Sequence, residues 1–438
     1  MMMILLMLSM FMLIYYIKIN LSSMYYQNSI MLMMFICLIF NNIYFNSLKI
    51  FMNMFIDCYS FYLIMLTLWI ISLMFMSKIK LIYKKLYILN IMLLMLFLIL
   101  TFMSISYFMF YFCFEVTMIP TLILILGWGY QFHRVEAGVY MFLYTLFASL
   151  PMIIVFLKIY FLFGTLDMVI LMNMNLVNHM YMYIYLLAAF LIKLPMFFFH
   201  LWLPKAHVEA SISGSMILAG IMLKLGGYGI MRVMLIMEEM CMKNNYFIMS
   251  FCLIGSLYIS IICLKVVDMK MLIAYSSVVH MGMLVVSLMT LNFWGIMGSL
   301  IMMISHGLCS SGLFCLVSIN YERIKSRSIF LNKGMMNLMP SLSLFWFFLC
   351  IFNMASPPSL NLLSEILMIN GILMWSNIYM LNMMFLSFMS VLYMMLFYSS
   401  IQHGMLYFSL NNFVMISNRE YLLVFLHLIP LFYLILIF

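Results

Sequence analysis

Four charged side chains interrupt long apolar stretches of this sequence. Glu115 lies in FYFCFEVTMIPT with no other charge within a dozen residues, and Lys193 lies in AAFLIKLPMFFFH. Lys224 lies in ILAGIMLKLGGYG, and Glu365 follows the double proline in PPSLNLLSEILM. Apolar surroundings disfavour the charged form of both group types, which brings proton exchange within reach of neutral pH. Two acids and two lysines on four segments favour proton transport over a structural pair such as Glu115 with Lys193.

Two histidines extend this set. His280, in AYSSVVHMG, and His306, in MMISHGLCSSG, have small hydroxyl residues nearby. Histidine titrates near neutrality and relays protons well. The alternatives are hydrogen-bonded core histidines or one haem, although a haem bundle calls for pairs at matched depth on facing helices. The other histidines are expected in loops or at helix ends: His133, His179, His200, His207, His403 and His427.

The amino-acid composition indicates what kind of environment surrounds these groups. Of 438 residues, 68% are apolar and 7% are charged, against roughly 25% charged in an average globular domain. A soluble fold of this size could not hide so much apolar side chain, so the bilayer must be the solvent. The first apolar stretch (residues 1–17) lacks a basic flank and a cleavage site, so we expect a helix and not a signal peptide.

The fold class expected is an all-α polytopic membrane protein of about fourteen helices. A spanning helix needs about 20 mainly apolar residues. We place the helices near residues 2–17, 28–46, 55–76, 86–104, 106–127, 137–162, 181–203, 212–236, 246–264, 270–290, 293–318, 338–368, 373–400 and 420–438.

The basic residues support this count. With alternating sides, fourteen of the 20 Lys and Arg residues fall in loops that follow odd-numbered helices. The other face holds only Lys49, Arg232 and Lys243, and Lys158 joins Lys193 and Lys224 inside helices. This bias puts the basic loops on the inner face and both termini on the outer face.

Prolines interrupt two of the predicted helices, at Pro195 and at Pro357–Pro358. Paired interruptions are typical of inverted-repeat transporters, with sites near the breaks; two ordinary kinks are the alternative. The predicted organisation is N-terminal helices, a first repeat, a second and inverted repeat, and a C-terminal helix, at residues 1–85, 86–236, 246–400 and 420–438.

Several kinds of cofactor site are not indicated. The nine cysteines are scattered singly, so neither a zinc site nor an iron–sulfur cluster is expected. We expect no strands, and therefore no glycine-rich nucleotide loop after a strand. The net charge of +9 comes from the inner loops and calls for no nucleic acid. We expect no cofactor and no metal on this chain.

One long segment resembles a known family. The stretch LPMFFFHLWLPKAHVEASISGSMILAGIMLKLGGYGIMR, residues 194–232, is similar to the chain 4 family of mitochondrial NADH–ubiquinone oxidoreductases, antiporter-like subunits of respiratory complex I. FEVTMIPT, MKMLIAYSSVVHMG, SHGLCSSGLFC, NYERIKSR and SPPSLNLLSE agree in order. The 58 Met, 41 Phe and 29 Tyr fit an insect mitochondrial genome. Ser211 departs from the proline usual in this family.

The resemblance implies a proton path in which Glu115 pairs with Lys193, Lys224 lies between half-channels, and Glu365 ends the route. His280 and His306 would bridge Lys224 to Glu365 through water. NADH, FMN, iron–sulfur clusters and ubiquinone would belong to other subunits, and chains 2 and 5 would be neighbours. The expected location is the mitochondrial inner membrane, with the basic loops in the matrix and both termini in the intermembrane space.

Two other functions compete with this one. A subunit of a multi-subunit cation/proton antiporter, without redox coupling, would have similar helices. A purely structural membrane anchor would tolerate neutralisation of all four buried charges.

Overall fold

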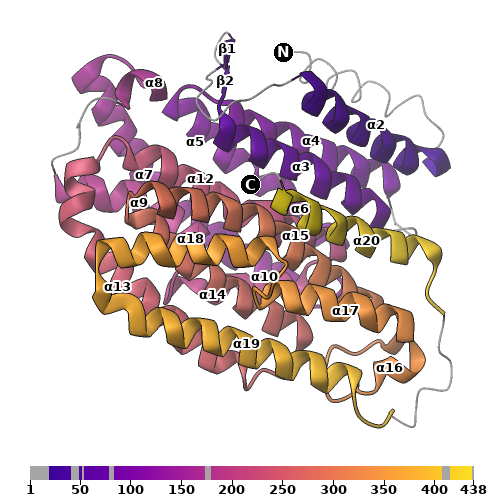
Figure 1. Cartoon of the computed structure of the whole chain (residues 1–438). Helices are drawn as coiled ribbons and strands as arrows, with labels where there is room; N and C mark the ends of the chain where they lie inside the picture. Colours follow the sequence, from indigo (N-terminus) through magenta and orange to yellow (C-terminus); the bar gives the residue numbers. More distant parts are fainter. Residues whose placement is uncertain are drawn as a thin grey trace. The chain divides into compact units, whose positions relative to one another are not determined.

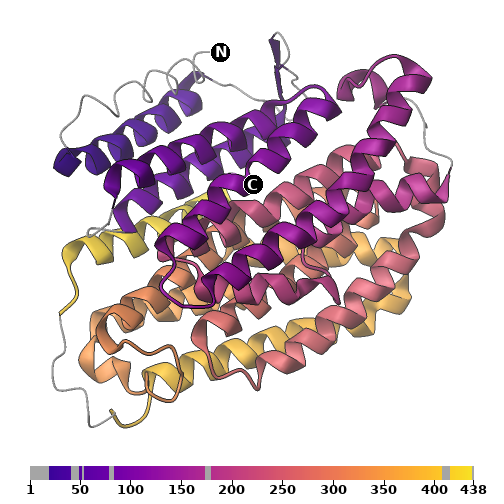
Figure 2. The ribbon, with the colours of Figure 1, turned by 180° about the vertical axis from the view of Figure 1, so that it is seen from behind.

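Helices make up nearly all of the ordered elements in the computed structural model (Figures 1 and 2). The structure describes residues 19–40, 49–51, 54–77, 83–172, 179–406 and 415–436. The helix expected near 2–17 and the basic residues Lys18, Lys78 and Lys80 lie outside these ranges. Two compact units can be distinguished, one of Met1–Lys193 with Glu209–Met242, the other of Leu194–Val208 with Lys243–Phe438.

The first unit contains a short hairpin and most of the N-terminal helices. Its elements are α2 Ile19–Phe40, β1 Lys49–Phe51, β2 Met54–Ile56, α3 Cys58–Ser77, α4 Lys84–Met103, α5 Tyr107–Val116, α6 Met118–Trp128, α7 Arg134–Phe163, α8 Met168–Leu171, α9 Met180–Lys193, α11 Ile212–Ile217, the π-helix η2 Leu218–Met222 and α12 Leu223–Met234.

The second unit contains the C-terminal helices. Its elements are η1 Phe199–Leu201, α10 Trp202–Glu209, α13 Glu238–Cys263, α14 Met269–Met289, α15 Phe293–Ile324, α16 Met335–Leu338, α17 Pro340–Asn353, α18 Leu360–Trp375, η3 Asn377–Tyr379, α19 Met380–Gln402, α20 Asn418–Tyr433 and η4 Leu434–Leu436. Residue Glu209 and the first turn of α13 are assigned to the first unit.

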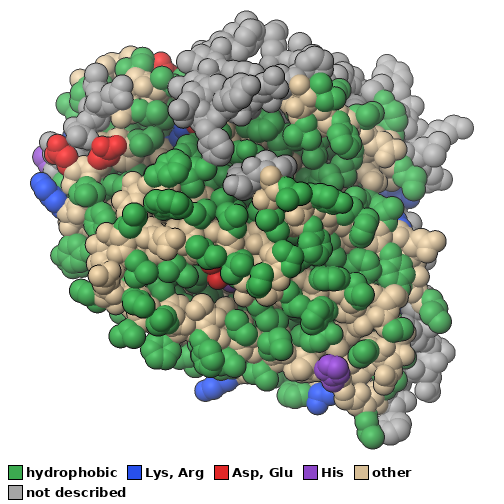
Figure 3. Space-filling model, viewed as in Figure 1, with side chains coloured by type: hydrophobic (Ala, Val, Ile, Leu, Met, Phe, Trp, Pro, Cys, Tyr) green, Lys and Arg blue, Asp and Glu red, His purple; other side chains and the backbone are tan. Residues whose placement is uncertain are grey.

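The expected fold class is confirmed. Among the described residues, ten helices are long and apolar enough to cross a membrane, and four shorter apolar helices accompany them. Apolar side chains cover most of the surface seen in Figure 3, and few charged ones appear there. The protein is therefore an all-α polytopic membrane protein, while the count of fourteen and the inverted repeats stay predictions.

The hairpin β1–β2 was not expected from the sequence. Its strands pair antiparallel, with Lys49 opposite Ile56 and Phe51 opposite Met54. Only three residues form each strand, so the apolar pattern around it reads as part of a helix.

Both predicted helix interruptions are present. Helix α9 ends at Lys193, and α17 is separated from α18 by residues 354–359. Each break contains a non-glycine residue with positive φ, Phe198 at 71° and Ala355 at 56°, a conformation that continuous helix cannot contain. In the second break, the Asn361 amide donates to the carbonyl of Phe352 at 2.7 Å, which also accepts from the backbone N–H of Ala355 at 3.1 Å.

Glycines allow α18 to approach α15 closely. A Cβ on Gly371 would lie 2.7 Å from the backbone nitrogen of Gly295, and one on Gly298 would lie 2.8 Å from that of Met368. Small residues at such contacts let two membrane helices pack backbone to backbone. The Asn292 amide donates across the same contact to the Gly371 carbonyl at 3.1 Å.

We predict that Gly371→Ala destabilises the second unit by about 1–3 kcal/mol, because the new methyl group meets backbone that cannot rotate away. The thermal unfolding temperature in detergent should fall. Gly127→Ala is the matched control, since a Cβ there meets nothing within 4 Å. Equal unfolding temperatures for the two variants would contradict the close contact.

Candidate functional site

Five of the six predicted site residues are buried, namely Lys193, Lys224, His280, His306 and Glu365. Glu115 is half-buried, and its Oε1 atom is buried without a hydrogen-bond partner. The first unit contains Glu115, Lys193 and Lys224, and the second contains the two histidines and Glu365. The candidate site therefore consists of two sets of ionisable groups, one in each unit.

Glu115 lies in the last turn of α5, three residues before Met118, where α6 begins. The sequence suggested a position in the middle of one helix. Pro120 explains the interruption, because its nitrogen cannot donate to the carbonyl of Val116. The Asn90 side chain donates to the Pro120 carbonyl at 2.9 Å. Glu115 therefore sits beside a one-residue interruption within the span Tyr107–Trp128.

Lys193 is the last residue of α9, directly before the first break. Its Nζ lies 3.4 Å from the carbonyl oxygen of Phe114 and 3.2 Å from the centre of the Phe114 ring. The charges of Lys193 and Glu115 interact electrostatically, but no ion pair within 4 Å joins them. The ammonium is thus held by a carbonyl dipole and an aromatic face, next to a carboxylate that it does not touch.

Aromatic rings enclose this ammonium. Phe114 contacts Phe190 edge to face at 5.7 Å between ring centres, and Phe110 contacts Phe190 at 6.0 Å and Tyr228 at 5.9 Å. Gly229 of α12 makes room for the Phe190 ring, since a Cβ there would lie 2.1 Å from it. These rings exclude water from the apolar side of Lys193.

Lys224 follows a π-helix that the sequence did not indicate. In the segment Leu218–Met222 the backbone takes one residue more per turn than an α-helix, which disturbs the regular hydrogen bonds. The Lys224 ammonium donates to the carbonyl of Ala219, inside this segment. Single π turns are frequent at functional sites. Here the π turn gives a fully buried lysine an acceptor within its own helix.

In the second unit, Glu365 lies close to His280. The carboxylate Oε1 is 3.7 Å from Nδ1 of His280, and the ring centres of His280 and His306 are 5.7 Å apart. Glu365 is in the second turn of α18, after the second break, and the histidines come from α14 and α15. The close α15–α18 packing holds this group together, with the Ser364 hydroxyl 3.3 Å from the Met302 sulfur.

Sequence reasoning missed a buried ion pair in the first unit. Arg232 was counted among the basic residues of the outer face, but it is buried in α12 and pairs with Asp57 at 2.6 Å. Its guanidinium lies over the rings of Phe55 and Tyr228. Asp57 and Arg232 are 175 positions apart in the sequence, so no local pattern links them. Each stands near a helix end, so the sequence does not mark either one as a charge buried in the bilayer.

The other histidines and Lys158 differ in their surroundings. His427 was expected in a loop or at a helix end, but it lies inside α20, buried, with Nδ1 2.8 Å from the Leu423 carbonyl. Lys158 is half-buried, and its ammonium donates an exposed hydrogen bond to the Tyr181 hydroxyl. The described residues hold no group of three or more His, Cys, Asp and Glu side chains that could hold a metal ion.

Solved structures share this fold. The chain is similar to a chain of respiratory complex I from Thermus thermophilus, with a TM-score of 0.88 and 20% identity over 99% of this chain and 94% of the other. A chain of the Mrp complex from Dietzia gives a TM-score of 0.81 with 15% identity over 92% and 79% of the two chains. At these identities the likeness concerns the fold.

Sequence relatives identify the family. Residues 104–392 match the model described as NADH:quinone oxidoreductase/Mrp antiporter, TM, and residues 1–101 match NADH-ubiquinone oxidoreductase chain 4, amino terminus. NADH-ubiquinone oxidoreductase chain 4 of Ceratitis capitata is 50% identical over 89% of this chain and 87% of the relative. That of Aedes aegypti is 53% identical over 73% and 72%. The chain therefore belongs to the NADH-ubiquinone oxidoreductase chain 4 family.

Proposed function

We propose that the chain is a proton-translocating membrane subunit of respiratory complex I, in which other subunits transfer electrons from NADH to ubiquinone. The observation that carries this proposal is the presence of ionisable residues buried in membrane-spanning helices of both units. Charges in hydrocarbon cost several kcal/mol, so residues with only a packing role would be apolar. Glu115, Lys193, Lys224, His280, His306 and Glu365 carry the protons.

The first unit acts as an electrostatic switch. Two unit charges about 4 Å apart interact by roughly 4 kcal/mol at an effective dielectric of 20, which changes a protonation equilibrium by about a thousandfold. Lys193 interacts with the charge of Glu115 without a direct ion pair. A small approach or retreat of Glu115 therefore changes whether Lys193 holds its proton, and Lys224 responds to the charge of Lys193.

The second unit receives the proton. Glu365 and His280 are 3.7 Å apart, slightly longer than a hydrogen bond, so a small movement or one water closes the gap. His306 is the next group, with its ring centre 5.7 Å from that of His280. A positive charge that arrives on His280 stabilises the neighbouring Glu365 carboxylate and so drives release of the proton from Glu365.

The proposed setting is the mitochondrial inner membrane, with the basic loops in the matrix and both termini in the intermembrane space. The other membrane-arm subunits are the expected partners, with the antiporter-like chains 2 and 5 as neighbours. NADH, FMN, iron–sulfur clusters and ubiquinone are bound by other subunits. Identities of 50% or more to three insect chain 4 sequences favour this setting over a cation/proton antiporter without redox coupling.

We predict that Lys224→Met abolishes or sharply reduces proton pumping through this chain while the complex still assembles, because methionine fills the site but carries no proton. The measurement is proton uptake per NADH oxidised in reconstituted vesicles. Lys158→Met is the control, since Lys158 is only half-buried and its hydrogen bond with Tyr181 is exposed. Full pumping in an assembled Lys224→Met complex would refute the role of Lys224.

We predict that Glu115→Gln slows coupled turnover, because the amide keeps the shape of the side chain but removes the charge that acts on Lys193. Rates of NADH oxidation with and without an uncoupler measure the effect. Glu136→Gln is the matched control, since Glu136 is exposed and pairs with His133 at 3.5 Å. An unchanged rate for Glu115→Gln would make Glu115 a structural residue.

We predict that purification through a tag on this chain recovers NADH dehydrogenase activity and iron–sulfur signals in one particle. Activity and electron paramagnetic resonance spectra of the purified particle provide the measurement. A particle that contains this chain with antiporter subunits, and without either property, would favour the antiporter instead.

A further inference from the structure

The ion pair between Asp57 and Arg232 joins the end of α12 to the start of α3. The Arg232 side chain is 4% exposed and that of Asp57 is 11% exposed. Asp57 directly precedes α3, and its Oδ1 atom accepts from the backbone N–H of Ser60 at 3.0 Å. Its other carboxylate oxygen, Oδ2, accepts from Arg232. The helix cap thus fixes the direction in which the carboxylate meets the guanidinium.

Two tyrosine hydroxyls hold the backbone around this pair. Tyr107, the first residue of α5, donates to the carbonyl of Arg232 at 2.9 Å. Tyr228, one turn before Arg232 in α12, donates to the carbonyl of Phe102 in α4 at 3.1 Å. Both carbonyls belong to the last turn of a helix, where backbone acceptors have no partner within that helix. Helix α12 is therefore bonded to α4 and α5 as well as to α3.

Aromatic rings continue from the ion pair to Lys193. The guanidinium carbon of Arg232 lies 4.7 Å from the centre of the Tyr228 ring. The ring centres of Tyr228 and Phe110 are 5.9 Å apart, and those of Phe110 and Phe114 are 5.8 Å apart. The Phe114 ring in turn lies 3.2 Å from the Lys193 ammonium. A series of direct contacts therefore joins Arg232 to Lys193.

Helix α5 contains both ends of this connection. Tyr107 begins the helix, and Glu115 lies eight residues later, or about 12 Å at 1.5 Å per residue. Glu115 directly follows Phe114, whose carbonyl and ring both contact the Lys193 ammonium. Close-packed protein interiors transmit displacements from one contact to the next. The position of Tyr107 against Arg232 therefore determines where α5 places Phe114 and Glu115 against Lys193.

We propose that Asp57 and Arg232 are positioning residues for the proton switch of the first unit. Their ion pair fixes the Tyr228 ring and the start of α5, and through them the place of Glu115 beside Lys193. Neither residue of the pair carries a transported proton. This inference rests on the proposed function.

A stabilising role alone accounts poorly for the pair. A buried ion pair seldom adds stability over apolar residues of the same volume, because both charges lose their hydration. Such a pair does fix geometry, since removal of one partner leaves the other charge buried and uncompensated. A purely structural pair would affect the amount of assembled complex and leave the turnover of each complex unchanged, so the two roles can be separated.

The test is the rate of coupled NADH oxidation per assembled complex in reconstituted vesicles, with the uncoupled rate as the measure of intact electron transfer. Asp57→Asn should lower the coupled rate at least twofold and leave the uncoupled rate unchanged, because asparagine still caps α3 but carries no charge. Tyr107→Phe should lower the coupled rate in the same way. It buries no unpaired charge, so it tests the inference even where Asp57→Asn impairs assembly.

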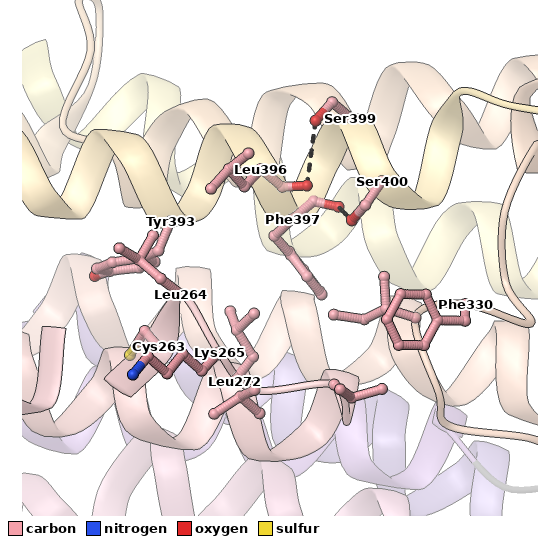
Figure 4. A pocket seen from close by; sticks show the side chains of 13 residues that line it. Cys263, Leu264, Lys265, Leu272, Phe330, Tyr393, Leu396, Phe397, Ser399 and Ser400 are labelled. Carbon is pink, nitrogen blue, oxygen red and sulfur yellow. Dashed lines mark hydrogen bonds between the residues drawn. The ribbon is translucent and has the colours of Figure 1, made fainter. Parts of the chain in front are cut away.

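Two variants serve as matched controls and should keep the wild-type coupled rate. Tyr26→Phe removes the hydroxyl of a buried tyrosine in the first unit that has no hydrogen-bond partner in the described structure. Ser400→Ala removes a hydroxyl in the second unit, where Ser400 lines a partly open cavity of about 260 Å³ and donates to the Phe397 carbonyl of its own helix at 3.0 Å (Figure 4).

A double-mutant cycle tests whether the pair acts through Glu115. Asp57→Asn should cause no further loss in a Glu115→Gln background, because the group that the pair positions is already neutral. A full additional loss, a wild-type rate in Glu115→Gln, or wild-type rates in both Asp57→Asn and Tyr107→Phe would overturn the inference. Less assembled complex with an unchanged rate per complex would assign the pair a structural role. Full pumping in Lys224→Met would overturn the proposed function instead.

Discussion

The absence of water inside a bilayer is the constraint on which the rest of this structure depends. Every backbone group and every charge in the hydrocarbon region must find its partner within the protein. A continuous helix satisfies the hydrogen bonds of its own backbone. It leaves no free backbone group that could serve as a partner for a buried ammonium or carboxylate. Near Lys193, Lys224 and Glu365 the helix is broken, distorted or packed on glycine.

The groups that contact the two buried lysines are neutral, so they hold the positive charge only weakly. Lys193 lies against a carbonyl and an aromatic ring, and Lys224 donates to a carbonyl of its own helix. Lys193 makes no ion pair within 4 Å with Glu115, which would fix its charge. Arg232 shows the contrast, because its tight pair with Asp57 at 2.6 Å suits a residue that stays charged. The same helix, α12, thus carries a lysine suited to exchange and an arginine suited to anchoring.

The buried charged residues could be predicted because a charge inside an apolar run is visible without any structure. The breaks at Pro195 and Pro357 were equally visible, since proline removes a donor. Other features depend on contacts that no local pattern reveals. The Asp57–Arg232 pair joins residues far apart in the chain, the β1–β2 hairpin is too short to show alternation, and the π turn before Lys224 has no sequence signature.

The π turn has a geometric consequence beyond its hydrogen bond to Lys224. Each added residue turns a helix face by about 100°, so the side chains before Leu218 and after Met222 are out of phase. Helix α11 packs on α3, whereas α12 packs on α9. One membrane span can thereby present two differently oriented faces to two neighbours. The extra residue rotates the second half of the helix relative to the first. The direction of the Lys224 side chain is therefore not fixed by the packing of the first half.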